Sequence, residues 1–486
     1  MPIIITLLVY FTVLYTLSRV SARGATNDAF YRGSRRSPWY MVAFGMVGAS
    51  VSGVSFVSVP GMVVHSGMTY LQTCLGFILG YFVVAFVLLP LYYRLNLTSI
   101  YSYLGTRFGP RSHSTGAWIF LVTKMIMAAV RFYVVCIIMQ RFVLDSLGVP
   151  FAVTVCAMVS LIWLYTRSGG IKTLVWTDSF QTLCLLVAIV LIFVNVAGEL
   201  GMSFGEAATA IADSEMSRVF VTDDWISPSN FWKQFISGAF IVIVMTGLDQ
   251  DMMQKNLTCK TLREARKDMC TYGFAFVPVN LMLLSLGVLL VLLLQRRGLD
   301  MSASADELLP MFAATGSLGM AVVVLFTIGL VASSFSSADS ALTSITTSWC
   351  VDIRRRQSDE RLRRRTHAAV CVLFVAFILM FRTLNSTSVI DAIYIICSYS
   401  YGPLLGLYAF GMLTRRGVSD RLTPYIAIAS PVLCFLVDQL AQHYFGYKFG
   451  YELLLLNGLI TFSGLWLSGL AVRNEKQEAQ AIPDME

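Results

Sequence analysis

The residues that could do chemistry gather in one apolar stretch, FTIGLVASSFSSADSALTSITTSWCVDI at 326–353. It is hydrophobic enough to lie in a bilayer, yet it carries many hydroxyl groups and the carboxylate of Asp339. Its serines recur at i, i+3, i+4, i+7 and i+11, so on a helix they form one polar stripe with the carboxylate at its edge. Such an array of oxygen atoms suits a small hard cation. The stripe consists of Ser333, Ser336, Ser337, Ser340 and Ser344.

Tight packing is the other explanation of the serines, because small residues let membrane helices approach and their hydroxyls bond to backbone carbonyls. Asp339 argues against packing alone. An ionisable group in a membrane helix costs about 2.5–3.5 kcal/mol on insertion scales and usually marks an ion path or a paired site. We therefore expect a cation site on this helix.

The composition indicates a polytopic membrane protein. Of the 486 residues, 56% are hydrophobic and 13% are charged, which is too apolar for a soluble chain of this length. Apolar runs of about 17–25 residues, long enough to cross a bilayer, recur about thirteen times and predict an all-α fold. The runs begin near residues 2, 40, 69, 115, 150, 174, 231, 270, 318, 368, 390, 424 and 451.

The positions of Lys and Arg predict the orientation. Most of the 36 basic residues fall in alternate loops, most densely in RRRQSDERLRRR at 354–365, and basic loops stay in the cytoplasm. The N-terminus is therefore expected outside and the C-terminus inside a plasma membrane, or an inner membrane in a bacterium. The same loops explain the net charge of +8, so no nucleic-acid partner is expected. None of the ten cysteines falls in a predicted outer loop, so the sequence implies no disulfide framework.

Segment 40–63, MVAFGMVGASVSGVSFVSVPGMVV, is interrupted by glycines, serines and Pro60. Such residues free backbone carbonyls at mid-membrane, which is tolerated where the backbone is buried or lines a cavity. Interrupted helices point to the central site of a transporter, and tight helix packing is again the alternative.

Several charged residues lie in or beside the apolar runs, and their roles stay open. Asp178 falls in the first turns of a helix, where the helix dipole also favours an acid. Arg131 either pairs with an acid such as Asp339 or meets an anionic ligand. The ammonium group of Lys124 could reach the membrane–water interface. Asp249 and Asp251 could be solvated at the cytoplasmic end of a helix. No catalytic motif is present, so the chain is not expected to be an enzyme.

Five motifs along the chain carry a family resemblance. They are GASVSGVSFVSVPG at 48–61, GGIKTLVWTD at 169–178, LDQDMMQKNL at 248–257, SSADSALTSITTSWCVDI at 336–353 and YGPLLGLYAFGMLTRRG at 401–417. Together they resemble the sodium/solute symporter family, which includes the sodium–glucose, proline and sialic-acid transporters. The resemblance implies thirteen or fourteen membrane helices, with ten core helices in two inverted five-helix repeats of the LeuT type and a broken first core helix.

The resemblance also divides the chain. Residues 1–39 would hold an extra membrane helix and an inner loop, and 40–413 the ten-helix transporter core. Residues 414–472 would add two C-terminal membrane helices, and 473–486 a short cytoplasmic tail. The expected partners are a small organic solute and the lipid bilayer, and the protein is expected to be a monomer.

Sodium (Na+) is the coupling ion that the resemblance implies. The principal site would consist of the backbone carbonyls of Gly48, Val51 and Ser333 and the hydroxyls of Ser336 and Ser337.

Some family members bind a second sodium ion, and here that site would involve Asp178, Asp339 and Ser340. The sialic-acid branch has a serine where this chain carries Asp339. Two neighbouring carboxylates repel unless a cation lies between them or one is protonated. We therefore expect Asp339 to tighten the second site or to titrate with it.

The solute would lie near the middle of the membrane. Ile395 stands where the sugar transporters have a sugar-binding Gln, so glucose-type recognition is not expected. A carboxylate-bearing solute, such as a sialic acid, an amino acid or an organic acid, is favoured because a buried Arg offers it a bidentate fork. The residues expected to touch the solute are Ser50, Ser52, Ser55, Tyr70, Gln72 and Arg131.

The predicted function is thus sodium-coupled symport that imports a small organic solute by alternating access. A proton-coupled symporter of the same fold is the nearest alternative, because Asp178 and Asp339 could carry the proton. A transporter-like membrane sensor is a further one.

Overall fold

The computed structural model describes residues 2–145, 148–225, 227–299, 307–313, 316–384, 389–447 and 449–481, without the side chains of residues 2, 142, 143, 383–396 and 471–481, and helices make up most of these ranges. Nine described helices are long and apolar enough to cross a membrane, and two bent helix pairs also meet this test. Helix α10 is a shorter apolar helix. The all-α membrane fold is thereby confirmed, whereas the exact number of spans, about thirteen by length and hydropathy, stays a prediction.

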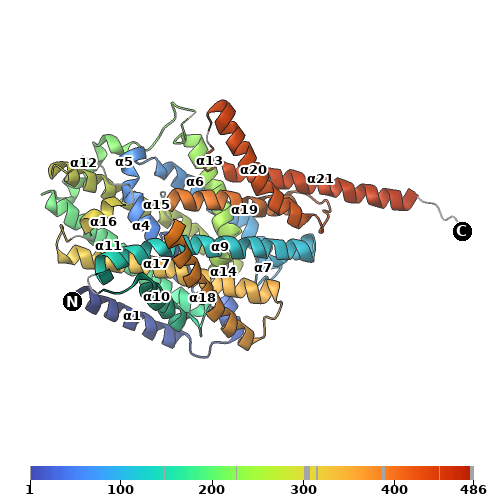
Figure 1. Ribbon diagram of the computed structural model, residues 1–486, viewed down its shortest axis with the longest axis horizontal. Coiled ribbons are helices and arrows are strands. Elements are labelled where there is room, and N and C mark those ends of the chain that lie inside the picture. The colour runs from blue at the N-terminus through green and yellow to red at the C-terminus, as the bar shows by residue number, and fades with distance from the viewer. Residues whose placement is uncertain are drawn as a thin grey trace.

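The first half of the chain forms helices α1 to α12, several of which are labelled in Figure 1. Short π-helical turns extend α6 over Val84–Leu88 and α9 over Gln140–Leu144. The helices are α1 Pro2–Ser21, α2 Asn27–Arg32, α3 Trp39–Ser50, α4 Gly53–Gly61, α5 Val63–Ser66, α6 Tyr70–Val83, α7 Leu89–Arg94, α8 Ser102–Arg107, α9 Pro110–Met139, α10 Phe151–Thr166, α11 Ile171–Glu199 and α12 Phe204–Ala212.

In the second half, α21 extends past the rest of the bundle towards the C-terminus (Figure 1). Further π-helical turns extend α13 over Ile243–Gly247 and α17 over Trp349–Ile353. The helices are α13 Phe231–Val242, α14 Gln250–Asn256, α15 Leu262–Arg296, α16 Leu308–Ala313, α17 Met320–Ser348, α18 Glu360–Leu384, α19 Val389–Leu413, α20 Thr423–Phe445 and α21 Leu453–Ala481.

The predicted break in the first core helix is present. Helices α3 and α4 meet at an angle of 58°. Val51 leaves the helical conformation with φ −77° and ψ 71°. Ser52 then caps α4 by accepting a hydrogen bond from the backbone N–H of Ser55, at 3.5 Å.

A second break, which the sequence reading missed, separates α13 from α14 by a bend of 71°. Asp249 is extended, with φ −103° and ψ 119°, and its carboxylate accepts a hydrogen bond from the backbone N–H of Asp251 at 2.8 Å. The apolar run that begins near residue 231, expected as one membrane helix, therefore forms two helices joined by a bend. The sequence contains a signal for this break, because Gly247 precedes an aspartate that suits a helix N-cap.

Helix α17 is the central element of the bundle. It packs against α11, α9, α4 and α3, and nearly every residue from Phe326 to Ser348 is buried. A helix that is buried on all sides must place its hydroxyls against other helices, and this places the serine stripe inside the protein. Helix α15 packs against the other side of the broken pair, touching both α3 and α4.

Gly287 of α15 lets that helix approach the backbone of α4. A Cβ atom built at this position would lie 2.0 Å from the carbonyl oxygen of Pro60. Real Cβ atoms do not come so close to a backbone oxygen, so any larger residue would push α4 away from α15.

We predict that Gly287→Ala destabilises the protein by about 1–3 kcal/mol, the usual cost of overpacking. Thermal unfolding of the purified protein measures this. Gly198→Ala is the matched control, because a Cβ atom added to that helical glycine would meet no other atom within 4 Å. Equal melting temperatures of the two variants would contradict the close packing of α15 on the broken helix.

Candidate cation and solute sites

The first break and the serine stripe meet at the end of α3. The last four carbonyls of a helix have no intrahelical donor, so the end of α3 at Ser50 presents free oxygen atoms. The Ser337 hydroxyl reaches them, because its Oγ donates to the carbonyl oxygen of Ala49 at 3.0 Å and to that of Ser333 at 3.1 Å. The structure thus brings together two of the elements that the sequence assigned to a principal cation site.

Ser336 and Gly48 lie on the side of this site that faces α11. The Ser336 hydroxyl donates to Asp178 Oδ1 at 3.0 Å, so this serine lies between the two expected cation sites. Gly48 packs directly on α11, since a Cβ atom there would lie 2.0 Å from Thr182 Oγ1. The last turn of α3 therefore packs tightly against α11 at Thr182.

The three residues predicted for a second ion also lie together. Ser340 Oγ lies 3.2 Å from Asp339 Oδ1 and 3.5 Å from Asp178 Oδ2, and thus bridges the two carboxylates. The Tyr165 hydroxyl donates to Asp339 Oδ2 at 2.6 Å. Both aspartates are almost completely buried, with exposed fractions of 1% and 0%.

Lys255 is the residue that sequence reasoning missed here. Its ammonium nitrogen lies 2.7 Å from Asp178 Oδ2, and the residue is 2% exposed. By its place in the chain, Lys255 begins one of the basic segments that the positive-inside pattern assigns to the cytoplasm, at about 255–267, and for this buried residue that assignment is wrong. The second break is the physical reason, since it folds α14 back into the protein and buries all of its residues.

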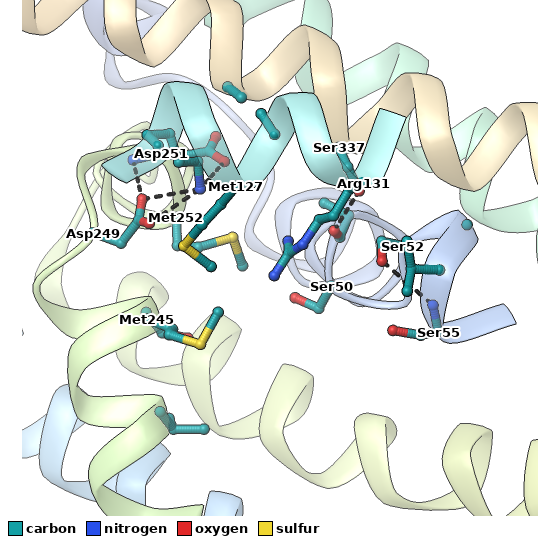
Figure 2. A pocket seen from close by; sticks show the side chains of 18 of the residues that line it. Ser50, Ser52, Ser55, Met127, Arg131, Met245, Asp249, Asp251, Met252 and Ser337 are labelled. Carbon is teal, nitrogen blue, oxygen red and sulfur yellow. Dashed lines mark hydrogen bonds and ion pairs between the residues drawn. The ribbon is translucent and has the colours of Figure 1, made fainter. Parts of the chain in front are cut away.

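A cavity of about 130 Å³ opens beside the first break (Figure 2). Apolar and sulfur-containing side chains, among them Met245 of α13, form part of its wall. Residues of α6, α9, α13, α15 and α17 complete it. Of the residues predicted to touch a solute, Ser50, Ser52, Ser55, Tyr70 and Arg131 line this cavity.

Gln72, the sixth predicted contact, is not among the lining residues. Its amide nitrogen donates to the carbonyl oxygen of Ser229 at 2.9 Å, and its amide oxygen accepts from the N–H of Val221 at 3.1 Å. Gln72 therefore fastens the loop between α12 and α13 to α6. The side chain of Ile395 lies outside the described residues.

Arg131 projects from α9 into the cavity, between the serines of the broken helix and an acidic pair (Figure 2). Its buried Nε atom has no hydrogen-bond partner. None of the carboxylates whose side chains the structure describes forms an ion pair with it. The alternative that Arg131 pairs with Asp339 is thereby excluded within this structure.

The acidic pair belongs to the second break. Lys124 Nζ lies 3.0 Å from Asp249 Oδ2 and 2.7 Å from Asp251 Oδ2. The Tyr401 hydroxyl donates to Asp249 Oδ2 at 2.7 Å. The possibilities left open by the sequence, that these aspartates are solvated and that Lys124 reaches the membrane interface, do not hold in this structure. The bend before α14 turns the two aspartates into the protein, where they meet Lys124 of α9.

Comparison with known proteins identifies the protein family. The profile of the sodium:solute symporter family matches residues 30–420. The chain belongs to the sodium:solute symporter family. It is 24% identical over 422 residues to the sodium/sialic acid symporter SiaT of Proteus mirabilis, covering 82% of this chain and 81% of that protein. It is 27% identical over 250 residues to the human sodium/iodide cotransporter, covering 50% of this chain and 38% of that protein.

A solved structure shares the fold. It is a substrate-bound, outward-open Na+-coupled sialic acid symporter, which superimposes with a TM-score of 0.81 at 21% identity and covers 96% of this chain and 97% of that chain. The family match confirms a multi-pass transporter that couples a small solute to sodium, and not an enzyme. The oxygen atoms at the proposed site are consistent with sodium, because the free carbonyls of α3 and the hydroxyls of α17 are the hard ligands that such an ion prefers.

In this symporter, Lys124 compensates two buried carboxylates at once. Lys124→Met would leave both without a cation, so we predict a loss of about 3–5 kcal/mol in the free energy of unfolding. Thermal or denaturant unfolding of the purified protein measures it. The control is Arg364→Met, which breaks an exposed pair with Glu360 and is expected to cost at most about 1 kcal/mol. Similar losses in the two variants would contradict a buried charge cluster.

Proposed function

We propose that this symporter imports a small organic carboxylate together with sodium, and that Arg131 holds the carboxylate. The observation that carries the proposal is the guanidinium group in the cavity, whose Nε lacks a partner. A buried donor without a partner costs free energy, and a carboxylate that accepts from it removes that cost. The names of the two relatives refer to sialic acid and iodide, which are both anions at neutral pH.

The same cavity supplies the other contacts of such a solute. The hydroxyls of Ser52, Ser55 and Tyr70 lie on its wall and suit the hydroxyl or amide groups of an organic acid. The apolar wall formed by α13 and α15 accepts the carbon skeleton. Because the solute carries a negative charge, its transport together with one sodium ion would move no net charge across the membrane.

We infer that the principal sodium ion binds between the carbonyls of Gly48, Val51 and Ser333 and the hydroxyls of Ser336 and Ser337. The contact of Ser337 with the end of α3 supports this assignment. The ion would fasten the broken helix to α17, and its release would let the two parts of the core move apart in alternating access. By linkage, sodium raises the affinity for the solute by the same factor by which the solute raises the affinity for sodium.

The proposed orientation follows from the basic loops, with the N-terminus outside and the C-terminus in the cytoplasm. In a bacterial cell the membrane would be the inner membrane. We propose that the protein works there as a monomer and without a nucleic-acid partner.

Uptake into liposomes tests the coupling. The purified protein should take up the solute when an inward sodium gradient is imposed. The double variant Ser336→Ala/Ser337→Ala lacks two ion ligands, so it should lose both this uptake and the thermal stabilisation by sodium. Candidate solutes are a sialic acid, an amino acid and a monocarboxylate. Potassium gradients serve as the control. Uptake that follows a pH gradient and ignores sodium would instead establish the proton-coupled alternative.

Substitution of Arg131 tests the solute class. A charged hydrogen bond contributes about 1.5–3 kcal/mol, so Arg131→Met should weaken binding of the carboxylate by about 10- to 150-fold. Sodium should still stabilise this variant. Arg218→Met, at an exposed pair on an outer loop, is the matched control and should bind normally. Equal affinities of the Arg131 variant and the wild type would contradict the proposal.

A further inference from the structure

A fixed positive charge lies where the sequence predicted a second sodium ion. The ammonium of Lys255 is 2.7 Å from Asp178 Oδ2. The Ser336 hydroxyl donates to the other oxygen of the same carboxylate, at 3.0 Å. Both oxygen atoms of Asp178 therefore already have a partner within the chain.

The neighbouring carboxylate has its partners as well. Asp339 Oδ2 accepts from the Tyr165 hydroxyl at 2.6 Å, and Oδ1 accepts from the Ser340 hydroxyl at 3.2 Å. Asp339 is also close enough to Asp178 and Lys255 for electrostatic interaction with both. The four oxygen atoms that would bind a second ion thus face one ammonium group and three hydroxyls.

The backbone of α14 holds Lys255 at this position. Two glutamines of the same short helix bond to other parts of the protein. Gln250 accepts from the N–H of Ile100 at 2.9 Å, and Gln254 donates to the carbonyl oxygen of Tyr31 at 2.8 Å. With its helix anchored and only 2% of the residue exposed, the ammonium is not free to move out into water.

We propose that Lys255 is a tethered cation that fills the second cation site, so that the symporter binds one sodium ion in each cycle, at the principal site. The inference rests on the proposed function and specifies its ion stoichiometry. An ammonium at bonding distance from Asp178 repels a second sodium ion and supplies the charge that the ion would bring. Without it, two buried carboxylates lie side by side with no fixed cation, and this arrangement favours capture of a free one.

Equilibrium binding of radioactive sodium to the purified full-length protein counts the ions directly. The wild type should bind one sodium ion per chain. Lys255→Met keeps much of the side-chain volume but removes the charge, so it should bind two, with the second depending on Asp178. Lys255→Arg keeps the charge and should bind one. Two ions in the wild type, or an unchanged count in Lys255→Met, would overturn the inference.

The double variant Lys255→Met/Asp178→Asn guards against misfolding, because it removes both members of the buried pair and leaves neither charge without its partner. It should fold and bind one ion, and a count of two in this variant would overturn the assignment to Asp178. Failure of the proposed function looks different. A wild type that binds no sodium in preference to potassium would reject both proposals, whereas one that binds two ions rejects only the tethered cation.

Discussion

The architecture depends on one constraint, that a backbone carbonyl inside a membrane must find a partner. The end of α3 leaves such carbonyls near the middle of the bundle. The Ser337 hydroxyl of α17 satisfies one of them at Ala49, at 3.0 Å. The hydroxyl stripe of α17 and the break in α3 therefore belong together. The break supplies acceptor atoms, the stripe supplies donors, and a cation between them would satisfy the oxygen atoms that remain.

The same constraint explains the charged residues that surround the second break. The bend after α13 places Asp249 at the start of α14, where its carboxylate caps the helix through the N–H of Asp251. A buried carboxylate needs a cation, which Lys124 supplies from α9. Breaking a helix inside the protein thus requires a local set of polar and charged partners, and these partners line the cavity beside the break.

Features that depend only on neighbouring residues along one helix could be predicted from the sequence. The serine stripe, the first break and the apolar helices follow from spacing and composition, so they could be predicted. The pairing of charges could not, because the partner of Asp178 comes from a segment almost eighty residues away in the chain. Lys255 read as a loop residue since the apolar run before it ends in aspartates, and only the bend at Asp249 turns those residues inward. The partners of Gln72 could not be predicted for a similar reason, since they lie in the loop between α12 and α13 and leave no signal in its own helix.

Helix α14 links the solute cavity to the cation cluster. Asp251 and Lys255 are four residues apart on it, hence on one face of the helix. The first pairs with Lys124 beside the cavity and the second with Asp178 beside the serine stripe. Asp251 lines the solute cavity together with Arg131, and Ser336 of the proposed principal site donates to the same Asp178 that pairs with Lys255. The anchored helix of seven residues thus has one charged side chain at each site, so the two sites are connected through charges that face each other across buried contacts.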